Sequence, residues 1–222
     1  RMSAARAAAA RMTTSAPVVG WIGLGNIGLP MARRVLATGL PLQVWARRRE
    51  TAAPIVGAGA SLAENPEALA RACDVIATIV GGPDDVSELH RRMAPVARPG
   101  TVFVDMTTAS PGNARESGEL AALAGAFAID APVTGGVAGA TQGALTSFVG
   151  GDADALARAR PVLEAFCRRI VPCGAAGSGY RMKLVNQTIV AGVLLGLADG
   201  AALARAGGMG ASVVKDALGA GT

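Results

Sequence analysis

Lys183 has the side chain best suited to proton transfer in this chain. The 222 residues contain nineteen arginines but only two lysines, so an amine at this position departs from the chain's general use of arginine. Arginine stays protonated at any working pH, whereas a lysine amine can be tuned to give up and take up a proton. We therefore interpret Lys183 as a candidate general acid–base. The alternative is a lysine that stands at the start of a helix by chance.

A glycine-rich turn near the N-terminus has the spacing of a dinucleotide site. It follows an apolar run over 18–22 and precedes a helix-like pattern over 30–38. In that setting the first glycine permits a tight turn, the second lets backbone approach a pyrophosphate, and the third lets helix and strand pack closely. The helix N-terminus adds amide donors and a positive dipole end. A cluster of packing glycines is the alternative, and the setting favours cofactor binding. We assign that role to the six residues of the turn, Gly23, Leu24, Gly25, Asn26, Ile27 and Gly28.

The residues that follow the second predicted strand bear on the choice of cofactor. An NAD site places an Asp or Glu there, about 20 residues after the glycine turn, to bind the ribose hydroxyls. This chain has three arginines at 47–49, and its first acid is Glu50. A guanidinium pairs with a 2′-phosphate through two hydrogen bonds. We therefore predict NADP rather than NAD, with Arg47 as the first candidate ligand and Arg48 as the second. A solvated basic turn is the alternative.

Strand-like and helix-like segments alternate along most of the chain. Strands are predicted over 18–22, 42–45, 74–80, 101–105, 126–130, 145–149 and 169–172, and helices over 30–38, 67–71, 84–93, 114–123 and 153–167. This order predicts an α/β fold, a doubly wound parallel sheet of Rossmann type with helices on both faces. From Met182 onward the pattern is helical only, which predicts the start of an all-helical C-terminal domain.

These patterns predict three parts of the chain. Residues 1–16 form an N-terminal extension that we expect to be disordered. Residues 17–180 form the NADP-binding domain. Residues 181–222 form an interdomain helix and a truncated helical C-terminal domain.

Composition limits the classes of partner. Apolar residues make up 51% of the chain and charged residues 17%, which is typical of a globular protein. Subtracting the three arginines of the extension from the formal charge of +5 leaves +2, and no basic stripe with interleaved aromatics remains. We therefore expect no nucleic-acid partner. The most apolar stretch, 188–206, is broken by glycines and carries Asp199 and Arg205, so we expect no membrane span.

Cysteine and histidine usage bears on location and on metals. The three cysteines have no CxxC spacing, which indicates reduced thiols in a cytoplasmic protein. An acid-free, Arg-rich start is also found in organellar transit peptides, but this one has no clear amphipathic pattern. His90 is the only histidine, so we expect neither a histidine-based catalytic triad nor a metal site.

Four motifs stand in a fixed order along the chain, at 20–32, 105–111, 130–151 and 177–187. The first surrounds the glycine turn, the second reads Asp-Met-Thr-Thr-Ala-Ser-Pro, the third begins Asp-Ala-Pro-Val-Thr-Gly-Gly, and the fourth contains Lys183. In these motifs the chain resembles the β-hydroxyacid dehydrogenase family, which includes 3-hydroxyisobutyrate dehydrogenase and tartronate semialdehyde reductase and belongs to the 6-phosphogluconate dehydrogenase superfamily. The resemblance runs from about Pro17 to the C-terminus.

The resemblance implies roles for the residues that match. Thr108 would lie beside the nicotinamide ribose, and Val80 would also contact the cofactor. A turn of three residues would bind the substrate carboxylate through a hydroxyl and converging amides, as such turns bind anions. Its residues are Thr134, Gly135 and Gly136.

The fourth motif would supply the catalytic groups. Lys183 would be the general acid–base, and Asn186, one helical turn later, would orient the amine and the substrate oxygen. Gln187 would contact the substrate. The family usually has serine at the position of Thr134 and asparagine at that of Gln187, so both departures bear on substrate choice.

The implied activity is an NADP-dependent interconversion of a small β-hydroxyacid and its semialdehyde, of the 3-hydroxyisobutyrate or 2-hydroxy-3-oxopropionate type. The partner is then a small aldehyde or hydroxyacid that bears a carboxylate. A non-catalytic dinucleotide-binding or oligomerisation module and an imine reductase-like enzyme are the alternatives. Relatives of both kinds usually lack the lysine, so Lys183 argues against them.

The resemblance also implies an assembly. In the family, the helical C-terminal domain closes the substrate cleft and carries much of the dimer contact, and this chain stops before most of that domain. An apolar helix face over 190–197 would need a cover. Exposed apolar patches usually mark interfaces, so we expect a homo-oligomer, a dimer or tetramer. The alternative is that the sequence is a fragment of a longer protein.

Overall fold

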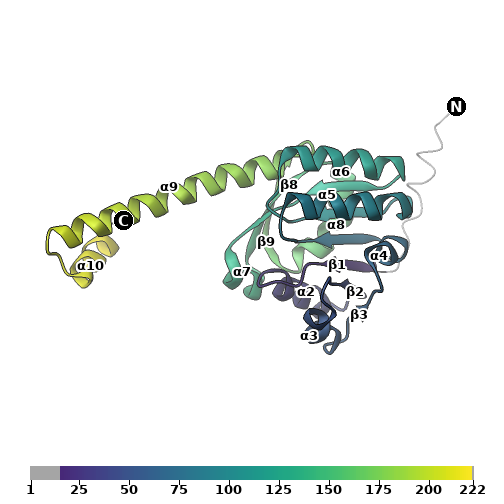
Figure 1. Cartoon of the computed structure of the whole chain (residues 1–222), viewed down its shortest axis with the longest axis horizontal. Coiled ribbons are helices and arrows are strands. Elements are labelled where there is room, and N and C mark those ends of the chain that lie inside the picture. The colour runs from purple at the N-terminus through teal and green to yellow at the C-terminus, as the bar shows by residue number, and fades with distance from the viewer. Residues whose placement is uncertain (1–15, 222) are drawn as a thin grey trace. The chain divides into compact units, whose positions relative to one another are not determined.

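A computed structural model describes residues 16–221, and side chains as far as residue 219 (Figure 1). The extension predicted over 1–16 lies outside the described residues except for Ala16. The chain forms two compact units, which meet between Lys183 and Leu184 in the sequence.

The first unit is built on one sheet. Within the described residues the strand order is β3-β2-β1-β4-β5-β6-β8-β7, and β9 pairs with β8. The strands are β1 (Val19–Ile22), β2 (Leu42–Trp45), β3 (Ser61–Leu62), β4 (Val75–Thr78), β5 (Val102–Asp105), β6 (Phe127–Asp130), β7 (Val133–Thr134), β8 (Leu145–Gly150) and β9 (Cys167–Gly174). All pairs from β3 to β6 are parallel, as predicted. The strand order reverses direction between β1 and β4, where such sheets leave a crevice at their carboxyl ends.

Helices cover both faces of this sheet. They are α2 (Gly28–Ala37), α3 (Ala53–Val56), α4 (Pro66–Ala72), α5 (Pro83–Met93), α6 (Pro111–Leu123), α7 (Gly136–Gln142) and α8 (Ala153–Glu164), with short 3₁₀ turns η1 (Arg49–Ala52) and η2 (Ala94–Val96). Side chains of α2 and α8 share one apolar cluster, and side chains of α4, α5 and α6 share another. Val75 and Ala77 of β4 belong to the first cluster, whereas Ile76 belongs to the second. This alternation buries each strand on both faces, which is the pattern of a doubly wound sheet.

The far edge of the sheet departs from the prediction. β8 runs antiparallel to both β6 and β7, where a wholly parallel sheet was expected. The chain between β6 and β8 contains only β7 and α7, and α7 packs against α2. Without a helix that crosses the sheet face, the chain returns alongside β6 in the opposite direction. The helix predicted over 153–167 also ends early, because Cys167 already pairs with Leu145 of β8.

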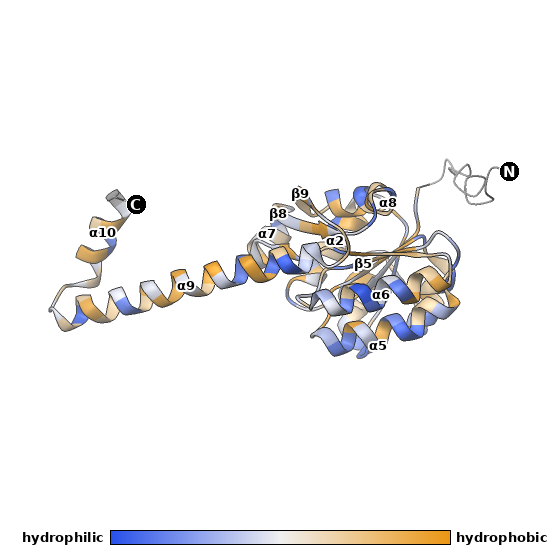
Figure 2. Cartoon of the chain, turned by 90° about the horizontal axis from the view of Figure 1, so that it is seen from above, coloured by the Kyte–Doolittle hydropathy of each residue, from blue (hydrophilic) through white to orange (hydrophobic). Residues whose placement is uncertain are grey.

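The second unit is helical. It contains the remainder of α9 (Ser178–Ala206), whose first residues lie in the first unit, and α10 (Ala211–Gly221). Many large apolar side chains of α9 are exposed, among them Ile189, Val193 and Leu195, and the stretch 189–198 contains only apolar residues and glycine (Figure 2). Among the described helices, α9 is the one that length and composition would allow to cross a membrane. A helix that packs against protein passes the same test, so the absence of a membrane span stays a prediction, as does the homo-oligomer.

His90 is a buried polar side chain on α5. It is 1% exposed, and neither of its ring nitrogens has a hydrogen-bond partner among the described residues. Its ring lies 5.1 Å from that of Phe103, centroid to centroid. Burial lowers the pKa of His90, because the charged imidazolium loses its water, while the nearby Asp105 and Glu116 carboxylates offset part of this effect.

The free energy of unfolding should therefore fall in mild acid. A histidine whose pKa is lower in the folded state contributes stability above its unfolded pKa of about 6.5, and this contribution is lost as the pH falls from there towards the folded pKa. The slope should reach up to about 1.4 kcal/mol per pH unit. Urea unfolding between pH 7.5 and pH 5.5 should show this slope in the wild type and a smaller one in His90→Leu. Leu89→Ala is the control, since it should lower stability equally at each pH. Equal slopes in wild type and His90→Leu would contradict the assignment.

Candidate active site

The glycine turn joins β1 to α2 at the point where the strand order reverses. Gly23 has a φ of 102°, and a Cβ atom there would overlap the carbonyl oxygen of Ile79, just after β4. A Cβ atom on Gly28 would overlap the carbonyl oxygen of Gly23. The Nε1–H of Trp21 donates to that same oxygen at 2.9 Å and fixes the turn from the side of β1. The close approach of β1, β4 and α2 therefore requires glycine at both positions.

Gly25 differs from these two glycines. A Cβ atom on Gly25 would meet nothing within 4 Å, so packing within the protein does not require glycine there. The helix α2 that follows has no side-chain cap at its N-terminus and no acid in its first turn. The positive dipole end of a ten-residue helix suits an anion such as a phosphate. Open space at Gly25 and an uncapped helix are what a bound pyrophosphate needs.

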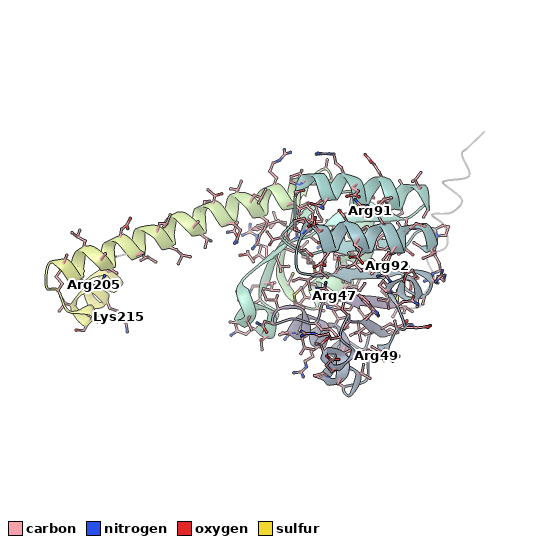
Figure 3. All side chains as sticks on the ribbon, viewed as in Figure 1. Arg47, Arg49, Arg91, Arg92, Arg205 and Lys215 are labelled. Atoms are coloured by element: carbon pink, nitrogen blue, oxygen red, sulfur yellow. The ribbon has the colours of Figure 1, made fainter. Side chains whose placement is uncertain are left out.

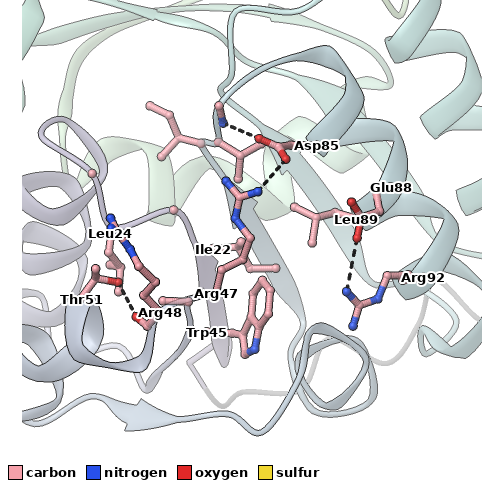
Figure 4. Close-up of a pocket in the computed structure, with 16 residues that line it drawn as sticks. Ile22, Leu24, Trp45, Arg47, Arg48, Thr51, Asp85, Glu88, Leu89 and Arg92 are labelled. Atoms are coloured by element: carbon pink, nitrogen blue, oxygen red, sulfur yellow. Dashed lines mark hydrogen bonds and ion pairs between the residues drawn. The ribbon is translucent and has the colours of Figure 1, made fainter.

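A cavity of about 840 Å³ lies in front of this turn (Figure 4). It is walled by the ends of β1, β2 and β4 and by one face of α5. Six of the predicted cofactor residues line it, namely Gly23, Leu24, Gly25, Arg47, Arg48 and Val80. Asn26, Ile27 and Gly28 continue the turn but do not line the cavity, and neither does Thr108, an exposed residue after β5. The hydroxyl oxygen of Thr107, the neighbour of Thr108, accepts a hydrogen bond from the Val80 amide at 3.0 Å and ties the ends of β5 and β4 together.

Basic side chains stand on two sides of the cavity. Figure 3 shows Arg47 after β2 and Arg92 on α5, which line the cavity, together with Arg49 and Arg91, which do not. Nη1 of Arg47 lies 3.1 Å from Oδ1 of Asp85, an ion pair that joins the end of β2 to α5 (Figure 4). Arg48 also lines the cavity, and its guanidinium has no partner among the described residues.

Arg92 is already neutralised. Its guanidinium makes two hydrogen bonds to the carboxylate of Glu67, at 2.7 and 3.1 Å, and lies 3.6 Å from Glu88. These contacts raise the pKa of Arg92, chiefly through the hydrogen bonds to Glu67, and lower that of Glu67 through the same bonds. Within the described residues, the cavity arginine without an acidic partner is therefore Arg48, near the end of β2.

The turn predicted to hold a carboxylate lies after β6. Thr134 ends β7 and is half-buried, and its hydroxyl makes no hydrogen bond within the described residues. Gly135 and Gly136 have positive φ values of 129° and 63° and are exposed. The structure leaves the hydroxyl and this backbone turn accessible, but they do not line the cavity of the glycine turn.

Two buried aspartates hold the first turn of α9. Asp105 and Asp130 end β5 and β6 and are register neighbours in the sheet. The carboxylate of Asp130 accepts from the amides of Gly177 at 2.7 Å and Tyr180 at 2.8 Å. The Tyr180 hydroxyl in turn donates to Oδ1 of Asp105 at 2.8 Å. Burial raises the pKa of Asp130, and the amide hydrogen bonds oppose that rise.

Lys183 follows this anchored turn. It is 8% exposed, its amine forms no ion pair with any described residue, and burial lowers its pKa. A lysine in this condition releases its proton more readily than one in water, which suits an acid–base role. Asn186 and Gln187 belong to the second unit; Oδ1 of Asn186 is buried without a hydrogen-bond partner, and Gln187 is exposed.

Sequence reasoning missed four residues of this region, Asp85, Asp105, Asp130 and Tyr180. A signal existed for the two strand-end aspartates, because each opens a motif directly after a buried run, at the edge where such sheets carry their sites. No signal in the sequence joins Asp85 to Arg47, since the pairing depends on where α5 packs.

Removing the Tyr180 hydroxyl should destabilise the first unit. Tyr180→Phe would leave the buried Asp105 carboxylate with one donor fewer, at a cost of about 1–3 kcal/mol. Urea unfolding would measure this loss. The control is Thr141→Ala, which removes an exposed hydroxyl bonded to the carbonyl of Val137 and should cost less than about 0.5 kcal/mol. A Tyr180→Phe protein as stable as the wild type would show that the hydroxyl does not stabilise Asp105.

Comparisons with known proteins agree with this geometry. Residues 18–174 match the family described as the NAD binding domain of 6-phosphogluconate dehydrogenase. The NAD-dependent L-serine dehydrogenase of Pseudomonas aeruginosa is 36% identical over 204 residues, which are 90% of this chain and 68% of that protein. The chain spans between 61% and 68% of the length of eight curated relatives that it matches.

Two solved structures extend the match. One is Mycobacterium tuberculosis 3-hydroxyisobutyrate dehydrogenase with L-serine, which is 34% identical with a TM-score of 0.85, over 94% of this chain and 72% of that one. The other is Psf3 in complex with NADP⁺ and 2-OPP, which is 32% identical with a TM-score of 0.82, over 90% and 72%. The chain belongs to the β-hydroxyacid dehydrogenase family and carries its NAD(P)-binding domain.

Proposed function

We propose that the protein interconverts a small β-hydroxyacid and its semialdehyde, with NADP as cofactor and Lys183 as the general acid–base. The observation that carries this proposal is the amine of Lys183, which is buried, unpaired and lowered in pKa next to a helix turn held by two strand-end aspartates. Membership of a family of NAD(P)-dependent dehydrogenases supports the class of reaction.

The residues around the cavity fit a dinucleotide. Gly25 and the uncapped start of α2 would hold the pyrophosphate, and the cavity in front of them would take the adenosine half. Arg47 and Arg48 would hold the 2′-phosphate of NADP. One structural neighbour is an NADP⁺ complex and one curated relative is named NAD-dependent, so the preference for NADP rests on the arginines and the lack of an acid at the end of β2.

The chain's own residues would bind, orient and transfer a proton. The bound cofactor supplies or accepts the hydride. In reduction, protonated Lys183 would donate a hydrogen bond to the carbonyl oxygen, stabilise the negative charge that grows on it, and then give up its proton. In oxidation, the neutral amine would remove the hydroxyl proton. Its lowered pKa makes both protonation states accessible nearer to neutral pH.

Thr134, Gly135 and Gly136 would bind the substrate carboxylate, with Asn186 and Gln187 orienting the rest of the molecule. L-serine, the ligand named for the neighbouring mycobacterial structure, is a small β-hydroxyacid and fits this substrate class. A cytoplasmic location and a homo-oligomer belong to the same proposal. The three free cysteines support the former, and the exposed apolar side chains of α9 support the latter.

Replacing the lysine should remove turnover without removing the cofactor. In the whole protein, Lys183→Met should lower kcat for a small semialdehyde about 10²- to 10⁴-fold, because it deletes the proton donor, and should leave the NADPH dissociation constant within about twofold. Lys215→Met, at the chain's other lysine, is the matched control and should keep wild-type kcat. Tight NADPH binding without turnover in the wild type would instead support the non-catalytic module.

The glycines of the turn should separate binding from stability. Gly25→Ala places a Cβ atom in open space, so it should leave the free energy of unfolding within about 0.5 kcal/mol and still weaken NADPH binding about tenfold or more, by keeping the pyrophosphate from the backbone. Gly23→Ala should instead destabilise the fold, because its Cβ atom meets the Ile79 carbonyl. Thermal unfolding and calorimetric titration with NADPH would measure the two effects. Unchanged affinity in Gly25→Ala would place the pyrophosphate elsewhere.

A further inference from the structure

One acid that lines the cavity of the glycine turn, Asp85, faces Arg47, the first candidate for binding the 2′-phosphate. Asp85 is the third residue of α5 and lines the cavity, and its Oδ1 lies 3.1 Å from Nη1 of Arg47. Its other oxygen, Oδ2, accepts the amide hydrogen of Gly81 at 3.1 Å. The carboxylate is thus held from two sides and directed at the guanidinium, as Figure 4 shows.

This acid stands where the second strand has none. The first acid after β2 is Glu50, and three arginines precede it. Asp85 comes from α5, 38 residues after Arg47 in the sequence, and brings a negative charge to the end of β2. The other acid on the cavity side of α5, Glu88, lies by Arg92 rather than by Arg47.

We propose that Asp85 is a specificity-determining residue that lowers the preference for NADP over NAD by competing with the 2′-phosphate for Arg47. A phosphate and a carboxylate that share one guanidinium repel each other, so the phosphate must displace Asp85 or accept a weaker bond. The ribose hydroxyl of NAD carries no charge and meets no such repulsion. This inference rests on the proposed function of the cavity as an NADP site.

Removing the charge of Asp85 should therefore shift the preference towards NADP. Asp85→Asn keeps an oxygen that can accept the Gly81 amide, so the loop before α5 should retain its bond. The ratio of the dissociation constants for NAD⁺ and NADP⁺ should rise about three- to tenfold, a range set by the partial exposure of the Arg47–Asp85 pair. Isothermal titration calorimetry of this chain with each dinucleotide would measure it.

The adjacent acid provides a matched control. Asp84 is exposed, does not line the cavity and has no ion-pair partner among the described residues. Asp84→Asn changes the net charge of the chain by the same amount and should leave the ratio within about twofold. An equal shift in Asp84→Asn and Asp85→Asn would overturn the proposal, since it would reduce the effect to net charge. No shift in Asp85→Asn would overturn it as well.

The variant Arg47→Met distinguishes a failure of this proposal from a failure of the proposed NADP site. If Arg47→Met alone leaves NADP⁺ affinity unchanged, the assignment of Arg47 to the 2′-phosphate fails. If it weakens NADP⁺ while Asp85→Asn has no effect, only the role of Asp85 fails. The expected result is that Asp85→Asn shifts the ratio in the wild-type background and not in Arg47→Met. A shift of the same size in both backgrounds would show that Asp85 acts without Arg47, contrary to the proposal.

Discussion

Burial of the Asp105 and Asp130 carboxylates side by side is the constraint on which the candidate site depends. A buried carboxylate without donors costs several kcal/mol, and here two of them are register neighbours at the ends of β5 and β6. Their donors come largely from the segment that starts α9, through two amides and the Tyr180 hydroxyl. The carboxylates at the ends of β5 and β6 therefore need hydrogen-bond donors from the start of α9. The same hydrogen bonds fix the position of that helix start. These hydrogen bonds also set the backbone position of Lys183, about one helical turn later.

The cofactor side is shaped by a different constraint, the close approach of backbone at the reversal of strand order. β1 lies between β2 and β4, so the turn after β1 passes against the chain after β4. Because β1 and β4 are adjacent, a Cβ atom on Gly23 would overlap the carbonyl oxygen of Ile79. The same arrangement places the end of β2 on one side of the crevice and the start of α5 on the other. Arg47 and Asp85 meet across it because the strand order brings them there.

The sequence predicts the elements and motifs of this architecture better than its long-range pairings. β2 was predicted to the residue, because an apolar run is bounded by a glycine and proline on one side and arginines on the other. β3, β7 and α7 were missed, since the two strands have only two residues each and the seven residues of α7 include two glycines. The antiparallel direction of β8 did have a signal, because no helix is predicted between the strands at 126–130 and 145–149 to carry the chain across the sheet. Among site residues, the glycine turn follows from local spacing, whereas the Arg47–Asp85 and Tyr180–Asp105 contacts join residues 38 and 75 positions apart and depend on tertiary packing.

The unpaired state of Lys183 is explained by the way the neighbouring acids are used. An amine that formed an ion pair with a buried carboxylate would have a raised pKa and would hold its proton, which would make it a poor base. Two carboxylates are buried close to the start of α9, yet both are occupied. Asp130 accepts two amides of the helix start, and Asp105 accepts the Tyr180 and Thr78 hydroxyls and the amide of Thr107. Because these donors are neutral, they satisfy the acids without lending them a cation. The burial of Lys183 then lowers its pKa unopposed, so that the start of α9 is anchored to the two aspartates and still carries an unpaired amine.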